Sequence, residues 1–277
     1  MNIKILWTKS RARLKLIQDD HSKKFNWLFL PGGPGLGSES LYDLISILNL
    51  PDAIWLVDFP GDGSNTTEDD ERYFANWSDA LIEAVDEFDN VILVAHSSGG
   101  MFALATPELE SKLKGLVLMD SAPDAGWQQY FAAYVSQYPI AEAEILQKKY
   151  EINPSNEILK NLTIACAPYF STTKSREKII TLLNSLPFNY KTHLWADKNF
   201  DKTYKAKWAP QKIPTLIFSG DQDVITPLKL FHEAKEFQRP NITIREISNA
   251  SHFPWLDNPE QVRQTFEEWI KKLAINK

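Results

Sequence analysis

Short continuous apolar runs recur along the chain, and most of them are followed by a loop that contains glycine. Four such runs are residues 27–30, 54–57, 91–95 and 215–218. Apolar runs of four to eight residues are typical of strands that are buried on both faces of a parallel sheet. A fifth run, residues 116–119, lies between the third and the fourth. The pattern therefore predicts buried parallel strands that end in loops of special conformation.

The stretches between these runs carry apolar residues at helical spacing. Within residues 73–88 the apolar positions include Trp77, Ala80, Leu81, Ala84, Val85 and Phe88. This spacing is that of one face of a helix. Because strands and helices alternate, we expect an open, mostly parallel α/β sheet with its functional loops at the carboxyl ends of the strands. Residues 1–18 are predicted to form an antiparallel β-hairpin that leads into this sheet.

One connection is far longer than the others, namely the one between Met119 and Thr215. Connections in α/β units usually consist of a few residues and a helix. Residues 121–208, which are rich in aromatic side chains, are therefore predicted to form an inserted helical cap over the functional edge of the sheet. Residues 1–120 and 209–277 would then form the core. The alternative is an additional βα unit with a long loop.

Composition restricts the class of protein. The net charge of -6 over 277 residues argues against nucleic acid or an anionic membrane as the main partner, because both attract clustered positive charge. Cys166 is the only cysteine, which excludes an intrachain disulfide and a multi-cysteine metal site. No apolar run approaches the roughly 18 residues of a membrane span, and the first residues do not resemble a signal peptide. The expectation is a cytoplasmic protein that acts on a small molecule.

A candidate nucleophile follows the third apolar run, in the sequence Ala-His-Ser-Ser-Gly-Gly. A serine on a sharp strand-to-helix turn requires small residues two positions before and after it, because the chain folds back on itself. Ser97 meets this requirement with Ala95 and Gly99. For Ser98 one of the two positions is occupied by the imidazole of His96. Ser97 is therefore the candidate nucleophile, and the alternative is a serine that only caps the helix.

A serine hydroxyl is a poor nucleophile unless a base accepts its proton. His252 lies between a strand-like run, residues 242–247, and a helix start at Asn258. A histidine in the loop between the last strand and the last helix can reach the serine across the strand ends. The other histidines are His21, His96, His193 and His232. Of these, His96 is adjacent to Ser97 in sequence, but its side chain should point away from the turn.

An acid must hold the base in one tautomer, and it is expected between the serine and the histidine in chain order. The loop after the strand at residues 215–218 offers two aspartates. We select Asp223, three residues after Gly220, as the triad acid, and we expect Asp221 to cap the loop. Asp120, at the end of the preceding strand, is the weaker alternative.

Ser97, Asp223 and His252 stand on separate strand-end loops, and with this set the chain resembles the α/β-hydrolase family over nearly its whole length. Residues 30–35, Leu-Pro-Gly-Gly-Pro-Gly, are similar to the family's oxyanion loop, with proline where histidine is usual. Residues 58–64, Asp-Phe-Pro-Gly-Asp-Gly-Ser, are similar to its turn after the fourth strand. The resemblance implies an eight-stranded, mostly parallel α/β sheet with helices on both faces and an inserted helical cap.

The resemblance also implies where the oxyanion of the reaction would be stabilised. The family uses backbone N–H groups for this purpose, and the corresponding residues are Gly33 and Ser98. The alternative, a phosphate-binding loop, does not fit, because the glycine spacing matches neither common phosphate-binding motif. No cofactor and no metal is implied.

Serine at the turn indicates acyl transfer to water through an acyl-enzyme. The predicted function is a serine hydrolase that cleaves a small-molecule ester, thioester or amide. The Gly-Gly-Pro-Gly segment also resembles the proline iminopeptidase branch, although Ser98 stands where those enzymes have tryptophan. They bind a free amine through cap acids, for which the candidates here are Glu142, Glu144, Glu151 and Glu157. An alternative of another class is a non-catalytic protein that binds a ligand or partner, and the complete triad argues against it.

Aromatic residues of the predicted cap are candidates for the walls of an acyl pocket, although core packing is the alternative for those at 167–170. The predicted set is Trp127, Tyr130, Phe131, Tyr169, Phe170 and Trp195. Such walls would set substrate choice, because the triad acts on the carbonyl group alone. The sequence indicates no oligomeric state.

Overall fold

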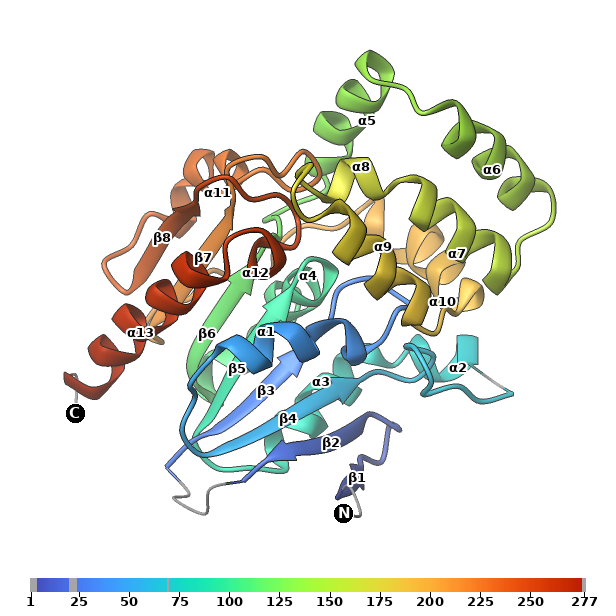
Figure 1. Ribbon diagram of the computed structural model, residues 1–277. Helices are drawn as coiled ribbons and strands as arrows, with labels where there is room; N and C mark the ends of the chain where they lie inside the picture. Colours follow the sequence, from blue (N-terminus) through green and yellow to red (C-terminus); the bar gives the residue numbers. More distant parts are fainter. Residues whose placement is uncertain (1–3, 20–23, 69, 276–277) are drawn as a thin grey trace.

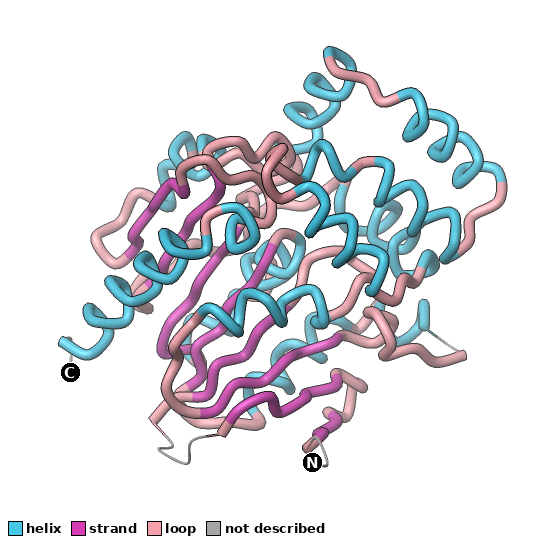
Figure 2. Tube along the Cα trace, in the orientation of Figure 1, coloured by secondary structure: helices cyan, strands magenta, loops and turns pink. Residues whose placement is uncertain are grey.

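A computed structural model describes residues 4–19, 24–68 and 70–275. Within these residues eight strands form one sheet in the order β1-β2-β4-β3-β5-β6-β7-β8 (Figures 1 and 2). The strands are β1 (Ile5–Trp7), β2 (Arg13–Gln18), β3 (Asn26–Leu30), β4 (Ala53–Asp58), β5 (Val91–His96), β6 (Leu113–Met119), β7 (Thr215–Gly220) and β8 (Ile242–Ile247). The predicted α/β class and the mostly parallel eight-stranded sheet are confirmed.

The two strands at the amino-terminal edge are antiparallel, and the rest of the sheet is parallel. β1 and β2 form the predicted hairpin, with Ile5 opposite Lys15, and β2 runs antiparallel to β4. Residues 1–3 of the predicted hairpin lie outside the described residues. From β4 to β8 all pairings are parallel, so the carboxyl ends of these strands meet at one edge.

Helices cover both faces of the sheet, and alternate residues of each central strand point to opposite cores. On β5, Leu93 and Ala95 belong to the core beneath α3 and α4, whereas Ile92 and Val94 belong to the core beneath α1 and α13. The helices around the sheet are η1 (Ser38–Leu41), α1 (Tyr42–Ile47), α2 (Asp70–Phe74), α3 (Trp77–Asp86), α4 (Ser98–Leu104), η2 (Pro107–Ser111), α11 (Lys229–Glu233), η4 (Lys235–Phe237), α12 (Pro254–Asp257) and α13 (Pro259–Ile275).

The helix expected over residues 73–88 is broken in the structure. α2 ends at Phe74 and α3 begins at Trp77, after Asn76. Asparagine competes for backbone hydrogen bonds and favours helix starts over helix interiors. The apolar face itself is as expected, since Ala80, Leu81, Ala84 and Val85 are buried against the sheet.

The long connection from β6 to β7 is helical and lies above the carboxyl ends of the strands (Figure 1). This β6–β7 segment contains α5 (Trp127–Gln137), α6 (Ala141–Ile152), α7 (Asn156–Ala165), α8 (Ala167–Phe170), α9 (Arg176–Ser185), α10 (Tyr190–Ala196) and the π-helix η3 (Asp197–Asp201). No helix of the described chain is both long and apolar enough to span a membrane.

The two ends of the β6–β7 segment are joined to each other just above the sheet. Asp124 and Lys205 form an isolated antiparallel bridge. Beside it the Ala125 N–H donates to the Tyr204 carbonyl oxygen at 2.9 Å, and the Ala206 N–H donates to the Pro123 carbonyl oxygen at 2.7 Å. We call this pairing of residues 123–125 with 204–206 the neck. The division into a core and a cap at residues 120/121 and 208/209 stays a prediction.

Candidate active site

Ser97 occupies a strained turn between β5 and α4. Its φ is 51° and its ψ is -123°, a backbone conformation that few non-glycine residues adopt. The turn is crowded: a Cβ atom on Gly32 would lie 2.7 Å from the Ser97 Cβ, and one on Gly99 would lie 2.5 Å from the Pro31 carbonyl oxygen. The glycines at these positions are therefore required by close approach of the chain.

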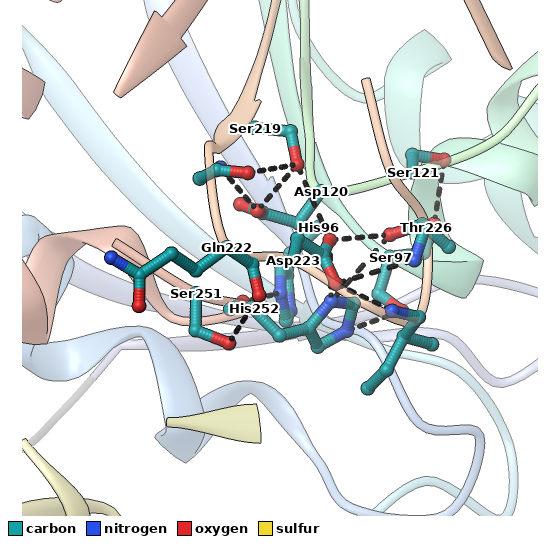
Figure 3. A network of polar contacts seen from close by, with 12 residues as sticks. His96, Ser97, Asp120, Ser121, Ser219, Gln222, Asp223, Thr226, Ser251 and His252 are labelled. Carbon is teal, nitrogen blue, oxygen red and sulfur yellow. Dashed lines mark hydrogen bonds and ion pairs between the residues drawn. The ribbon is translucent and has the colours of Figure 1, made fainter. Parts of the chain in front are cut away.

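The structure brings Ser97, His252 and Asp223 together in one connected line (Figure 3). The Ser97 Oγ lies 3.1 Å from the Nε2 of His252, and the His252 Nδ1 lies 3.0 Å from the Oδ2 of Asp223. The three residues follow β5, β8 and β7, respectively. A carboxylate only accepts, so Nδ1 carries the hydrogen and Nε2 is free to accept the serine proton.

The Asp223 carboxylate is buried but surrounded by hydrogen-bond donors. Its Oδ1 accepts from the N–H groups of Ile225 at 2.9 Å and Thr226 at 3.2 Å, and its Oδ2 accepts from the Thr226 hydroxyl at 2.8 Å. Burial by itself raises the pKa of this carboxyl group, but the charge and hydrogen bond of His252 and the donors of residues 225–226 outweigh it and lower the pKa to about 2. Asp223 is therefore ionised at neutral pH.

His96 is buried beneath the turn and contacts the loop that carries His252. Its Nε2 lies 3.0 Å from the His252 carbonyl oxygen. A carbonyl oxygen accepts, so this nitrogen carries a hydrogen and donates. Burial, followed by the proximity of His252, lowers the pKa of His96 to about 3, so its ring is neutral. His96 thus supports the loop of His252.

The other two aspartates near the site have different surroundings. Asp221 accepts the Ala250 N–H at 3.0 Å and so connects the loops after β7 and β8, which is the capping position that was predicted. Asp120 is completely buried, and the Ser219 hydroxyl lies 3.0 Å from its Oδ1. Both carboxyl groups therefore lie next to the Asp223 loop, but only Asp223 contacts His252 directly.

The glycine-rich loop after β3 is held by two buried aspartates, one at the end of β4 and one in the turn that follows it. Asp62 accepts the Gly35 N–H at 2.8 Å, and Asp58 accepts the Ser38 N–H at 2.7 Å. Burial raises the pKa of Asp62 to about 7; the Gly35 N–H opposes this rise, and the charges of Asp58 and Glu39 add to it. Two of the segments that the sequence singled out are thus parts of one hydrogen-bonded unit.

A cavity of about 220 Å³ opens at Ser97. Gly33 and Ser98, the predicted oxyanion residues, line it together with Ser97 and His252. Of the six aromatic residues predicted for its walls, Trp127, Phe131 and Phe170 line it. The other wall residues are divided between aliphatic and polar side chains. The site therefore combines a potential nucleophile and base with a chamber whose surface is mainly apolar.

The sequence matches the model of a known family, described as "Alpha/beta hydrolase family", over residues 27–265. The chain belongs to the alpha/beta hydrolase family. Among curated relatives it is similar to the pimeloyl-(acyl-carrier protein) methyl ester esterase of Wigglesworthia glossinidia brevipalpis. The two are 30% identical over 264 residues, which cover 91% of this chain and 95% of that protein.

Solved structures of other hydrolases share this fold. One is an alpha/beta fold family hydrolase from Bacillus anthracis, with a TM-score of 0.74 and 17% identity over 97% of this chain and 99% of that one. Another is a proline iminopeptidase-related protein from Thermus thermophilus, with a TM-score of 0.71 and 18% identity over 99% of both chains. At these identities the likeness concerns the fold.

Three of the predicted wall residues of this alpha/beta hydrolase lie elsewhere. The Tyr130 ring faces the Nζ of Lys229 at 3.7 Å. The Tyr169 hydroxyl donates to a backbone carbonyl at 2.7 Å, and the Trp195 ring packs edge-on against Phe74 at 4.9 Å. None of the three is among the residues that line the cavity of the described structure. The sequence marks these residues only as aromatic residues of the predicted cap, and residue type alone does not indicate which of them face Ser97.

Sequence reasoning missed polar residues that line the same cavity of the hydrolase. Thr163, His193 and Asp201 contribute to its wall. The His193 Nδ1 lies 3.2 Å from the Tyr150 hydroxyl, and burial lowers the pKa of this histidine. Burial, aided by the charge of Asp197, raises the pKa of Asp201 to about 6. No motif marks these residues, because only the packing of α7, α10 and η3 brings them to the cavity.

The glutamates that were candidates for amine binding are all exposed: Glu142, Glu144, Glu151 and Glu157. None of them lines the cavity as the structure describes it.

A direct link joins the β6–β7 segment to the loop of the hydrolase's histidine. The Thr172 hydroxyl donates to the Oδ1 of Asp257 at 2.5 Å, and the Oδ2 of Asp257 accepts the Ser251 N–H at 2.9 Å. Asp257 is buried, so its bond to the Ser251 N–H is shielded from water, whereas the bond to Thr172 is only partly buried. The residue next to His252 is thereby fastened to the helices above it.

Proposed function

We propose that this alpha/beta hydrolase is a serine esterase that cleaves a small-molecule ester or thioester through an acyl-enzyme. The observation that carries the proposal is the continuous contact from Ser97 Oγ through His252 to Asp223, at 3.1 and 3.0 Å, at the floor of an apolar cavity. The nucleophile, base and acid follow the roles of a Ser-His-Asp triad.

The geometry supports the following sequence of steps. The Ser97 Oγ attacks the carbonyl carbon of the ester while its proton passes to the His252 Nε2, and Asp223 stabilises the imidazolium. The imidazolium then gives this proton to the leaving alcohol, and an acyl-enzyme remains on Ser97. Water attacks the acyl group, His252 takes one of its protons and returns it to the serine, and the acid is released.

The N–H groups of Gly33 and Ser98 are the proposed donors to the oxyanion. Ser98 is the first residue of α4, where an N–H has no partner within the helix. Neither N–H donates to another residue in the described part of the chain, and both residues line the cavity. Free, preorganised donors of this kind stabilise a developing negative charge at no reorganisation cost.

The cavity and the relatives together favour an acyl ester over an amide. Aliphatic and aromatic walls bury an apolar acyl chain. The curated relative acts, by its name, on a methyl ester. Methyl and other small alkyl esters of a medium-length acyl chain are therefore the first substrates to test.

An aminopeptidase of the proline-releasing type is the second candidate, supported by the Gly-Gly-Pro-Gly segment and by the fold of the iminopeptidase-related protein. The acid available to an amine in this cavity is Asp201, not one of the predicted glutamates. A non-catalytic binding protein is the third candidate, and it gives no reason for a fully assembled triad.

The test is labelling with a fluorophosphonate together with a substrate panel. The panel contains methyl, ethyl and aryl esters of graded acyl length, a thioester, and aminoacyl amides with free and with blocked amines. Labelling with ester turnover supports the esterase, and turnover of free-amine amides alone supports the aminopeptidase. A well-folded protein that is neither labelled nor active on any of them contradicts both enzymatic proposals.

A further inference from the structure

A second carboxyl group lies beside the proposed triad acid, and the steps above do not use it. Asp120 follows β6, and Asp223 follows the adjacent strand β7 (Figure 3). One oxygen of each carboxyl group and one ring nitrogen of His252 all lie within 4.8 Å of one another. Two carboxylates this close in a buried site repel each other strongly, so one of them tends to stay protonated.

The Ser219 hydroxyl bridges the two carboxyl groups. Its Oγ lies 3.0 Å from the Asp120 Oδ1 and 3.2 Å from the Asp223 Oδ2. A hydroxyl group has one hydrogen and can donate across only one of these contacts. The other contact becomes a hydrogen bond only if the carboxyl group supplies the hydrogen. The arrangement is therefore one proton short when both aspartates are ionised.

The surroundings decide which aspartate holds that proton. Asp223 accepts from Ile225, Thr226 and His252, so every partner apart from Ser219 is a donor to it. Asp120 accepts a single N–H, from Gly220 at 3.0 Å, and its Oδ2 is buried without a partner in the described chain. A charged oxygen left without a donor is costly. Burial, and then the charge of Asp223, also raise the pKa of Asp120 well above its usual range.

We propose that Asp120 carries a proton at neutral pH and, through Ser219 and Gly220, acts as a positioning residue for the triad acid. The inference rests on the proposed esterase mechanism, in which Asp223 orients His252. Asp120 does not touch the reacting atoms: it fixes the end of β7, from which the Asp223 loop starts. The single negative charge that faces His252 then belongs to Asp223.

Residues at the end of β6 also hydrogen-bond to the nucleophile turn. The Ser97 N–H donates to the Met119 carbonyl oxygen at 2.8 Å, and the Ser121 hydroxyl donates to the Ser97 carbonyl oxygen at 2.8 Å. Residues 119–121 therefore contact both the nucleophile turn and the acid loop. Asp120 is the member of this stretch that reaches the acid side.

The test compares Asp120→Asn, Asp120→Leu and the exposed control Asp43→Asn in the full chain. In Asp120→Asn the uncharged amide oxygen takes the place of Oδ1 and still accepts the Gly220 N–H and the Ser219 hydroxyl, so kcat/KM falls by less than about tenfold. Leucine removes both, so kcat falls by about 100-fold with KM within about threefold, as for loss of a group that orients a catalytic partner. Turnover of Asp120→Leu equal to that of the wild type overturns the proposal.

The pH dependence distinguishes a neutral Asp120 from an ionised one. The titratable groups near it are Asp223 and His252, and His96, which contacts the backbone of His252, is neutral. If Asp120 is neutral, Asp120→Asn leaves the acid limb of the kcat/KM profile where it is. If Asp120 is ionised, the variant loses a negative charge near the imidazolium, and the limb moves to lower pH by about one unit. Such a shift overturns the proposal.

Infrared spectroscopy gives a readout that does not depend on turnover. A protonated buried carboxyl group has a carbonyl stretch band that a carboxylate lacks. Asp62 can contribute such a band near neutral pH, so the Asp120 band is read from difference spectra: it should appear in wild type minus Asp120→Asn and not in wild type minus Asp43→Asn. If Asp120→Leu does not fold, Ser219→Ala replaces it and should lower kcat about threefold to thirtyfold at constant KM; an unchanged kcat overturns the positioning role. A wild type without esterase activity contradicts the proposed function, while the band still decides the protonation of Asp120.

Discussion

Two regions meet at the cavity, and they differ in how deeply their residues are buried. The strand-end site, which consists of Ser97, Asp120, Asp223, His252 and their loops, lies on parallel strands, and the last three residues are at most 6% exposed. The β6–β7 segment begins with α5, in which no residue is buried, although Trp127 and Phe131 of this helix face the cavity. The comparison shows that the reactive groups stand on a buried base, whereas the part of the pocket wall that α5 contributes is lightly packed.

This difference indicates a division of roles. A triad needs its atoms held within a few tenths of an ångström, which buried strands and shared hydrogen bonds provide. A pocket wall must match the shape of its substrate, and the side chains of α5 have few packing contacts that would restrict their substitution. Substitutions in the strand-end site should therefore affect every substrate, and those in the β6–β7 segment should affect some substrates more than others.

The largest effect is expected at the nucleophile. Ser97→Ala should abolish fluorophosphonate labelling and lower kcat by about 10⁴-fold or more, since no group replaces the attacking oxygen. The matched control is the neighbouring Ser98→Ala, which keeps the backbone N–H and most of the labelling. Labelling that persists in Ser97→Ala, measured by mass spectrometry of the intact protein, would end this assignment.

Removal of the acid should come next. Asp223→Asn should lower kcat by about 10³- to 10⁴-fold, because the amide no longer holds the tautomer of His252 or stabilises its imidazolium. Asp221→Asn, in the same loop, should cost far less, since its carboxyl group only caps the Ala250 N–H. Steady-state kinetics on one ester suffice. If Asp120→Asn is the more severe variant, the triad acid follows β6 instead of β7.

A buried charge near the glycine-rich loop should affect stability rather than turnover. The folded-state pKa of Asp62, about 7, lies above the usual value, so the folded protein binds this proton more tightly than the unfolded chain does. The free energy of unfolding therefore falls as the pH rises from about 4 to about 7, by up to about 4 kcal/mol for three pKa units.

Asp62→Asn should remove this fall in the free energy of unfolding at high pH. Urea denaturation should show the variant more stable than the wild type at pH 8 and similar to it near pH 4. The exposed control Asp43→Asn should show no such difference. A variant that is less stable at pH 8 would mean that the Asp62 charge supports the loop.

Substitutions on the cavity side of the β6–β7 segment should change selectivity. Phe131→Ala and Phe170→Ala should alter the ratio of kcat/KM between short and long acyl esters by about tenfold to a hundredfold, since each methylene in a pocket contributes roughly 1–3 kcal/mol. Fluorophosphonate labelling should stay within about tenfold. The control is Tyr130→Ala on α5, whose ring faces Lys229. Equal losses for all acyl lengths would contradict the division of roles.

The smallest effect is expected at the exposed glutamates of the segment. Glu142→Gln and Glu157→Gln should change the kcat/KM of esters and of free-amine amides by less than about twofold, because neither residue lines the cavity. Asp201→Asn is the informative comparison, since Asp201 does line it. A selective loss of free-amine substrates in Asp201→Asn would favour the aminopeptidase.

The sheet and its loops could be predicted because they leave strong local signals. Buried parallel strands require unbroken apolar runs, and tight loops require glycine, as at Gly32 and Gly99, where a Cβ atom would collide with the neighbouring chain. The choice of Ser97 over Ser98 followed from the same steric rule. Chain order then restricted the base and the acid to loops that the fold places side by side.

The pocket wall could be predicted only in part, because its signal is tertiary. Trp127 and Tyr130 are both aromatic and lie on the same helix, yet only Trp127 lines the cavity. Asp201 and His193 reach it through the π-helix and α10, which no sequence motif marks. The proton proposed for Asp120 also left no trace in the sequence, because it depends on Ser219 and Asp223, which lie about 100 residues further along the chain.

The neck has a consequence for how such a protein can evolve. The β6–β7 segment leaves the sheet and returns to it at adjacent strands, and residues 123–125 and 204–206 close it with backbone hydrogen bonds that need no particular side chain. Doubling the length of a closed loop costs only about 0.6 kcal/mol in chain entropy. Recombination that joins at the neck can therefore exchange the whole segment between relatives, and so supply new substrate preferences to an inherited triad.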